Sequence, residues 1–142
     1  MRKIYLDTNV ILEHAMQRSN YLQVVDIFHL AELDAIECYT SAATFFTIAF
    51  FLRKEKNSKQ IFKTYFSFIK VVATSDADLH TAVNSSFTDI EDAFQYYSAL
   101  GKCDAFVTFN KKDFIKHQNK QLSCFTPAEF LKIAICLLCC IN

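Results

Sequence analysis

Carboxylate and amide side chains recur in three segments of the sequence, each placed after a short apolar stretch or at the start of a predicted helix. These segments are residues 7–9 (Asp-Thr-Asn), 89–92 (Asp-Ile-Glu-Asp) and 108–113 (Thr-Phe-Asn-Lys-Lys-Asp). Oxygen atoms of such side chains are the ligands that Mg²⁺ and Mn²⁺ prefer. A divalent ion held among them lowers the pKa of a bound water and stabilises charge on a phosphate. The chemistry indicated is therefore metal-assisted hydrolysis of a phosphodiester.

The acids differ in how far their positions indicate function. Asp7 ends a buried apolar stretch, where an unpaired carboxylate is costly, so its position favours a functional role. Asp92 lies in the first turn of a predicted helix and is also assigned a functional role. Asp89 is placed as the N-cap of the same helix, which is a structural role, and Asp113 fits either interpretation. Asp104 precedes a predicted strand, at the end of the sheet away from the other acids, and is interpreted as structural.

The elements that must position these residues are short apolar segments. They predict strands at residues 2–6, 36–40, 70–74, 105–108 and 122–125. Helices are predicted from residues 10 and 20, over residues 42–54, 58–68 and 90–100, and from Pro127, with a turn or helix at 110–114. Short apolar strands that alternate with helices are typical of an α/β protein with a parallel sheet covered on both faces. Ligands of such sheets bind outside the carboxyl ends of the strands, so the three polar segments are expected to meet there.

Cap residues predict where several of these helices begin and end. Thr8 or Asn9 is placed to cap the first helix, Ser41 the helix over residues 42–54, and Asp76 the helix that follows the third strand. Gly101 lies just after the helix over residues 90–100 and is predicted to stop it.

The composition predicts one globular domain over residues 1–142, with 52% hydrophobic and 21% charged residues. One glycine and one proline argue against an all-β sandwich and against a glycine-rich phosphate loop. The formal net charge is zero, so a nucleic-acid substrate requires a local basic patch or bridging metal ions. Two basic clusters are candidates, although a solvated helix face is the favoured interpretation of each: Arg53, Lys54, Lys56, Lys59 and Lys63, and Lys111, Lys112, Lys116 and Lys120.

The N-terminal segment does not resemble a secretory signal, because Asp7 interrupts its apolar stretch early. We therefore expect a cytoplasmic protein whose six cysteines are not a disulfide framework. The apolar segment at residues 130–141 is shorter than the roughly 20 residues that span a bilayer. It is expected to pack on the sheet or on a partner subunit, and no membrane association is predicted.

Residues 6–12 (LDTNVIL), 89–100 and 104–114 resemble the PIN-domain family, whose members include toxin ribonucleases of bacterial toxin–antitoxin pairs. Residues 126–131 also resemble the start of the last helix of that family, and the order and spacing agree over essentially the whole chain. The resemblance implies a three-layer α/β/α fold with a parallel five-stranded sheet in the order 3-2-1-4-5. It also implies Mg²⁺- or Mn²⁺-dependent cleavage of RNA, an antitoxin protein as a partner, and a homodimer.

The resemblance further implies Asp7, Asp92 and Asp113 as catalytic acids and metal ligands. Its supporting polar positions are Asn9, Thr108, Asn110, Asp89 and Glu91. Two positions depart from the family pattern. Thr47 stands where members usually carry a glutamate on the helix after the second strand, and the fourth family acid is an amide at Asn110. Because a threonine hydroxyl contributes no charge to a metal, binding is expected to weaken unless Asp89 or Glu91 compensates.

Three functions are compatible with these residues. A metal-dependent endoribonuclease, the toxin of a toxin–antitoxin pair, accounts for the acids at strand ends. A catalytically degenerate PIN domain that binds RNA or a protein accounts for Thr47 and Asn110. A phosphatase or phosphotransfer receiver also places acids at the ends of parallel strands, but no Asp and Lys occupy the positions that a receiver requires, and it ranks last.

Overall fold

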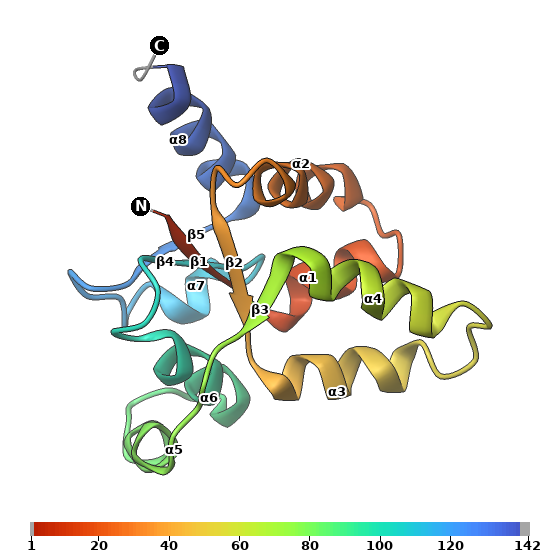
Figure 1. Ribbon diagram of the computed structural model, residues 1–142. Helices are drawn as coiled ribbons and strands as arrows, with labels where there is room; N and C mark the ends of the chain where they lie inside the picture. Colours follow the sequence, from red (N-terminus) through yellow and green to blue (C-terminus); the bar gives the residue numbers. More distant parts are fainter. Residues whose placement is uncertain (1, 140–142) are drawn as a thin grey trace.

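Five parallel strands form the centre of the computed structural model, which describes residues 2–139 (Figure 1). The strands are β1 (Lys3–Leu6), β2 (Glu37–Thr40), β3 (Ile69–Val71), β4 (Ala105–Val107) and β5 (Ser123–Phe125). Their order in the sheet is β3-β2-β1-β4-β5, and every pair is parallel. The predicted fold class and the strand order implied by the resemblance are therefore confirmed.

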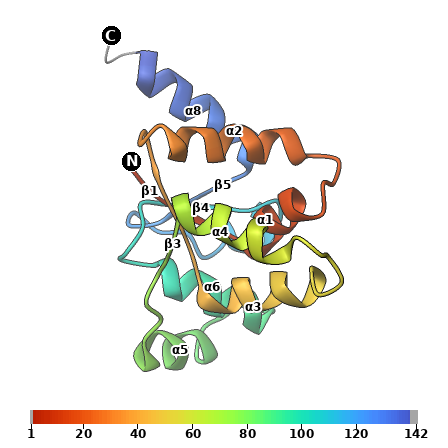
Figure 2. The ribbon, with the colours of Figure 1, turned by 45° about the vertical axis from the view of Figure 1, so that its right-hand side comes forward.

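Helices cover both faces of this sheet and make three layers. Within the described residues they are α1 (Thr8–Ala15), α2 (Tyr21–Glu32), α3 (Ala42–Phe51), α4 (Ser58–Phe68), α5 (Asp76–Val83), α6 (Ile90–Ala99), α7 (Lys111–Phe114) and α8 (Pro127–Cys139). Figures 1 and 2 both place α2 and α8 on the opposite side of the strands from α5 and α6. Both faces of the central strands are therefore covered, which explains why residues 4–6 of β1 and 105–107 of β4 are apolar and buried without interruption.

The alternation of side chains along β1 divides the core into two clusters. Ile4 and Leu6 are fully buried in a cluster with residues of α1, α2, α3, α4 and α8. Tyr5 points the other way and is buried in a second cluster with residues of α6 and α7. Its ring stacks on Phe106 of the neighbouring strand, with ring centroids 5.0 Å apart. Strand β1 therefore contacts the helices on both faces of the sheet, and Asp7 follows directly at its carboxyl end.

Some predicted boundaries and caps were wrong. The third strand begins one residue earlier than predicted and ends at Val71, and α3 ends at Phe51, not at residue 54. Ser75, not Asp76, caps α5: its hydroxyl accepts from the backbone N–H of Asp78, whose carboxylate accepts from the backbone N–H of Ser75. This reciprocal pair satisfies two backbone donors at the start of the helix. The predicted cap at Ser41 is confirmed.

Gly101, the only glycine of the chain, lies one residue past the C-cap of α6 and has a φ of +74°. A Cβ at this position would meet nothing within 4 Å, so only the left-handed backbone conformation penalises a larger residue. We expect Gly101→Ala to lower the free energy of unfolding by about 1 kcal/mol, measured by urea denaturation. An unchanged midpoint would contradict this origin of the helix stop.

Three further expectations concern the described part of the chain. Across residues 2–139, no helix is both long and apolar enough to cross a membrane. Cys38, Cys103, Cys124 and Cys136 form no disulfide. Phe130 of α8 is buried in the first core cluster, as expected for packing on the sheet. The rest of the apolar C-terminal segment, beyond Cys139, lies outside the described residues.

Candidate functional site

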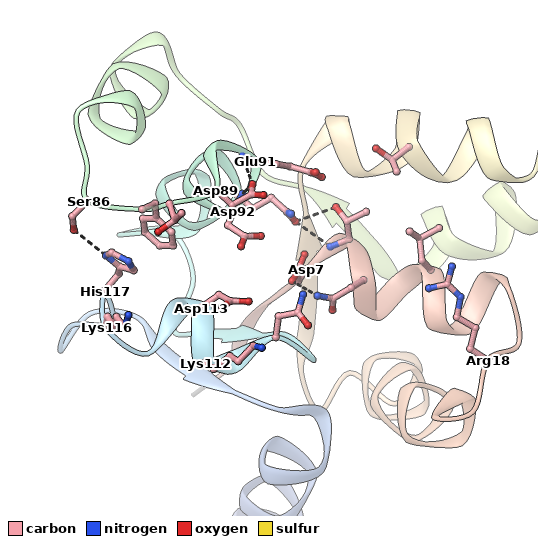
Figure 3. Close-up of a pocket in the computed structure, with 18 residues that line it drawn as sticks. Asp7, Arg18, Ser86, Asp89, Glu91, Asp92, Lys112, Asp113, Lys116 and His117 are labelled. Carbon is pink, nitrogen blue, oxygen red and sulfur yellow. Dashed lines mark hydrogen bonds between the residues drawn. The ribbon is translucent and has the colours of Figure 1, made fainter.

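A cleft of about 780 Å³ opens at the carboxyl ends of β1 and β4, where the sequence predicts a site (Figure 3). Thr108 is fully buried behind this cleft. Every other residue predicted to belong to the site lines it: Asp7, Asn9, Thr47, Asp89, Glu91, Asp92, Asn110 and Asp113. The topology therefore brings together four segments that are far apart in the sequence.

Asp7 occupies the N-cap position of α1, but its carboxylate does not cap that helix. Only 2% of the residue is exposed. Its Oδ2 accepts two short hydrogen bonds, from the Asn9 side-chain nitrogen and from the Thr108 hydroxyl, each 2.6 Å long. Both bonds use one carboxylate oxygen, so these two residues orient the carboxyl group without occupying its second oxygen.

The residues that hold Asp7 are themselves fixed by backbone groups. The backbone N–H of Phe109 donates to Asn9 Oδ1 at 3.1 Å, and the backbone N–H of Asn110 donates to Thr108 Oγ1 at 2.9 Å. The loop after β4 is thereby attached to the start of α1. Asn9 and Thr108 are positioning residues, because they act on the carboxylate of Asp7.

The start of α6 supplies the second group of acids. Asp89 caps the helix as predicted: its Oδ1 accepts from the backbone N–H groups of Glu91 and Asp92, at 2.8 and 3.2 Å. Asp92 is half-buried and faces the cleft from the first turn, whereas Glu91 is exposed. In Figure 3, the carboxylates of Asp7, Asp92 and Asp113 surround a common space.

The environment of Asp7 and Asp92 raises their pKa values above the usual value of an aspartate. Burial raises the pKa of Asp7 to about 6, against the lowering effect of the hydrogen bond from the Thr108 hydroxyl. Burial also raises the pKa of Asp92 to about 7, with further increases from the charges of Asp7, Asp89, Asp113 and Glu91. Carboxylates that raise one another's pKa in this way lack a compensating cation.

No described basic residue pairs directly with these acids. Within residues 2–139, no lysine, arginine or histidine forms a salt bridge with an acid that lines the cleft. Lys112 and Lys116 line the cleft, and Arg18 lies at its opposite end. Lys111, from the same predicted basic cluster, pairs instead with Glu129 at 2.8 Å.

The donor set fits a magnesium or manganese ion that keeps several waters. In the described part of the chain, no three His, Cys, Asp or Glu side chains lie close enough together to form a complete metal site. Mg²⁺ needs only one or two carboxylates, because waters and a substrate phosphate supply the remaining oxygens. The second oxygen of Asp7 and the carboxylate of Asp92 meet this requirement. Thr47 lines the same cleft and adds only a hydroxyl.

Sequence reasoning missed several residues of the cleft. Gln95 is 5% exposed, and its Oε1 accepts from the backbone N–H and the hydroxyl of Thr8, at 3.0 and 3.1 Å. Its position three residues after Asp92 on one helix is a signal that could have identified it. Arg18, Phe87 and His117 belong to connecting segments, whose paths no periodic pattern predicts.

Comparison with known proteins identifies a sequence family and a similar solved structure. Residues 3–112 match the sequence family described as PIN domain. Among solved structures, the crystal structure of VapBC2 from Rickettsia felis bound to a DNA fragment from their promoter contains a similar chain, with a TM-score of 0.61 and 16% sequence identity. The match covers 87% of this chain and 98% of that one, and at this identity it shows the fold alone. The comparison with curated proteins gives no match.

Proposed function

Because the chain belongs to the PIN-domain family, we propose that it is a metal-dependent endoribonuclease, the toxin of a toxin–antitoxin pair. One observation carries the proposal: Asp7, Asp92 and Asp113 come from distant segments and line one cleft, and none of them forms a salt bridge with a basic residue in the described part of the chain. A divalent ion is the neutralising group that also attracts a phosphodiester. An RNA substrate implies a cytoplasmic location, which is part of the proposal.

In this proposal Asp7 and Asp92 hold a Mg²⁺ or Mn²⁺ ion, with Asp113 as the third acid. When bound, the ion supplies an activated water and stabilises negative charge on the phosphate. Asn9 and Thr108 hold the carboxylate of Asp7 through one oxygen, which would leave its second oxygen available to the ion. Lys112 and Lys116 are placed to contact phosphates of the RNA.

The proposal is tested by incubating the wild-type protein and Asp92→Asn with several structured and unstructured RNAs in Mn²⁺, Mg²⁺ or EDTA. We expect cleavage by the wild type in Mn²⁺ and none in EDTA. The variant is expected to lose more than about 100-fold in rate, since even loss of an outer-shell partner of a metal costs 10–100-fold. A wild type that cleaves none of the RNAs would overturn the proposal.

Metal binding is expected to strengthen with pH. The metal must displace the proton of Asp92, whose pKa is raised to about 7, so the ionised fraction rises about tenfold between pH 6 and pH 8. The apparent affinity should rise by a similar factor, as measured by calorimetry. At pH 7 about half a proton should be released for each ion bound, detected by comparing two buffers of different ionisation enthalpy. Affinity that does not change over this range would contradict the ligand role of Asp92.

A second function is favoured by a specific observation. Thr47 occupies the cleft without a charge, and the described acids do not form a complete metal site. A PIN domain that binds RNA or protein without cutting it would tolerate both features. The cleavage assay above separates the two functions, because a binding module gives no turnover in Mn²⁺.

Two partners are proposed, one from the similarity to the VapBC2 structure and one from an exposed apolar surface. The VapBC2 structure supports an antitoxin as a partner. The phenylalanine surface is formed by Phe46, Phe50 and Phe51 of α3 and Phe66 of α4, of which Phe46 is 75% exposed. Large exposed apolar patches mark protein–protein contacts. We propose that this surface joins two copies of the chain.

The double variant Phe46→Ser, Phe50→Ser tests the homodimer. These side chains contribute little to the core, because both are mostly exposed, so the variant should fold normally. We expect the wild type to sediment as a dimer and the variant as a monomer in analytical ultracentrifugation. A wild type that sediments as a monomer, or a variant that stays dimeric, would contradict the proposed interface.

A further inference from the structure

Two aromatic rings that the proposed chemistry does not use stack at one end of the acidic cleft. Phe87 lies in the connection between α5 and α6, and His117 follows α7. Their ring centroids are 3.6 Å apart, with an interplanar angle of 18°. Both residues are half-buried and both line the cleft that contains Asp92 and Asp113. A pair that only completed the core would be covered, whereas this stack is partly open to the cleft.

The rest of the molecule holds this stack in place. Behind Phe87 lie the rings of Tyr96, Tyr97 and Phe114, with centroids 5.4, 6.3 and 5.7 Å away. The backbone of His117 is attached on both sides: its N–H donates to the carbonyl of Phe114 at 2.9 Å, and its carbonyl accepts from the Tyr96 hydroxyl at 2.6 Å. The rings are therefore ordered before any ligand binds, which lowers the entropic cost of binding.

We propose that the Phe87–His117 stack is a binding platform for an unpaired RNA base next to the scissile phosphate, so that the cleft selects single-stranded RNA. Base–aromatic stacking supplies affinity that does not depend on charge. The chain needs such a source, because its net charge is zero and the centre of its cleft is acidic. A base in a duplex is covered by its neighbours and cannot offer its face to the platform.

The charges around the platform agree with this role. Burial and the neighbouring Lys116 lower the pKa of His117, which favours its neutral ring. Lys112 and Lys116 line the same part of the cleft, where they can contact phosphates on either side of the stacked base. Figure 3 places His117 and Lys116 on one side of the carboxylates and Arg18 on the other, so a strand that crosses the cleft passes all three groups.

The inference rests on the proposed function, but its test measures binding and not cleavage. A fluorescein-labelled single-stranded RNA 10-mer and a duplex of the same sequence are titrated with protein in Ca²⁺ and in EDTA, and fluorescence anisotropy gives the affinities. The variants are His117→Ala, which removes the ring, and His117→Phe, which keeps an aromatic face. His80→Ala is the matched control, because His80 is an exposed histidine of α5 that does not line the cleft.

We expect the wild type to bind the single strand more tightly than the duplex. His117→Ala should weaken single-strand binding about tenfold, while His117→Phe and His80→Ala stay within about twofold. A 2-aminopurine base in the RNA should be quenched by the wild type and by His117→Phe, but not by His117→Ala, which reports stacking directly. Near-UV circular dichroism of each variant confirms that it is folded.

The outcomes separate the inference from the function. Cleavage of RNA by a protein whose single-strand affinity does not change in His117→Ala would overturn the platform and leave the nuclease intact. Binding that depends on His117 in a protein that does not cleave would support the platform and overturn the nuclease. Equal affinity for single strand and duplex, or no binding of the single strand by the wild type, would overturn the platform.

Discussion

Asp7→Asn is expected to abolish RNA cleavage and, in the absence of metal, to make the protein more stable. Both effects have one origin, which is the burial of an ionisable carboxylate at the proposed metal site. The substitution preserves the local hydrogen bonds, because Asn9 and Thr108 both donate to the same oxygen of Asp7 and an amide oxygen can accept both. What the variant loses is the charge, and with it the ligand that the metal requires.

The gain in stability follows from the pKa of Asp7. Its pKa is raised from 3.8 to about 6 in the folded protein, so the folded state holds its proton more tightly than the unfolded state. Ionisation at pH 7 therefore costs about 3 kcal/mol of folding free energy, at 1.36 kcal/mol for each unit of pKa. Asparagine avoids this cost because it does not ionise.

The sign of the pH dependence makes the prediction specific. A raised pKa contributes stability that is fully present below pH 4 and is lost as the pH rises through 6. The stability difference between Asp7→Asn and the wild type should therefore grow from pH 4 to pH 6 and stay constant above it. Urea denaturation in EDTA across this range measures the difference. Mn²⁺ should then stabilise the wild type and leave the variant unchanged.

Asp104→Asn is the matched control at the other end of the sheet. Asp104 accepts from the backbone N–H groups of Arg2 and Lys3 at 2.7 and 2.9 Å, and these bonds lower its pKa. The same substitution there should reduce stability and leave cleavage unaffected. If Asp7→Asn instead destabilises the metal-free protein at pH 7, Asp7 is a structural residue and the metal site is contradicted.

More of the fold than of the candidate site could be predicted from the sequence. Strand order follows from the resemblance, and the strands themselves follow from apolar segments bounded by polar ones. Asp7 and Asp92 could be identified because one ends a strand and the other starts a helix, both at the edge where parallel sheets bind ligands. Asp104 was interpreted as structural because it precedes a strand, at the end of the sheet away from the other acids. Its carboxylate accepts hydrogen bonds from the backbone N–H groups of Arg2 and Lys3, which agrees with a structural role.

What could not be predicted depends on side-chain direction and on loop paths. The carboxylate of Asp7 does not cap α1 and instead accepts hydrogen bonds from the side chains of Asn9 and Thr108. Periodicity places Gln95 on a helix but does not show that it reaches Thr8. His117 joins the cleft because the segment after α7 folds back over Phe87, and nothing in its sequence pattern indicates this path.

Thr47→Glu is expected to strengthen metal binding about tenfold and to raise the rate of cleavage at limiting metal. Thr47 lines the cleft at the position where the family usually carries a glutamate, and it is half-buried on a helix, where glutamate has a favourable propensity. A carboxylate beside a divalent ion contributes more than the roughly 1.4 kcal/mol that a tenfold change requires, even at the high effective dielectric of a protein surface.

The control is Thr47→Gln, which has the size of glutamate and carries no charge. Without metal, Thr47→Glu should be less stable than Thr47→Gln at pH 8, because it adds a negative charge to carboxylates that already raise the pKa of Asp92. With saturating Mn²⁺ the order of stability should reverse. Calorimetric titration with Mn²⁺ and thermal denaturation with and without the ion measure both effects. A glutamate variant that binds Mn²⁺ no better than the glutamine variant would place the ion out of reach of α3, and the departure at Thr47 would then have no bearing on catalysis.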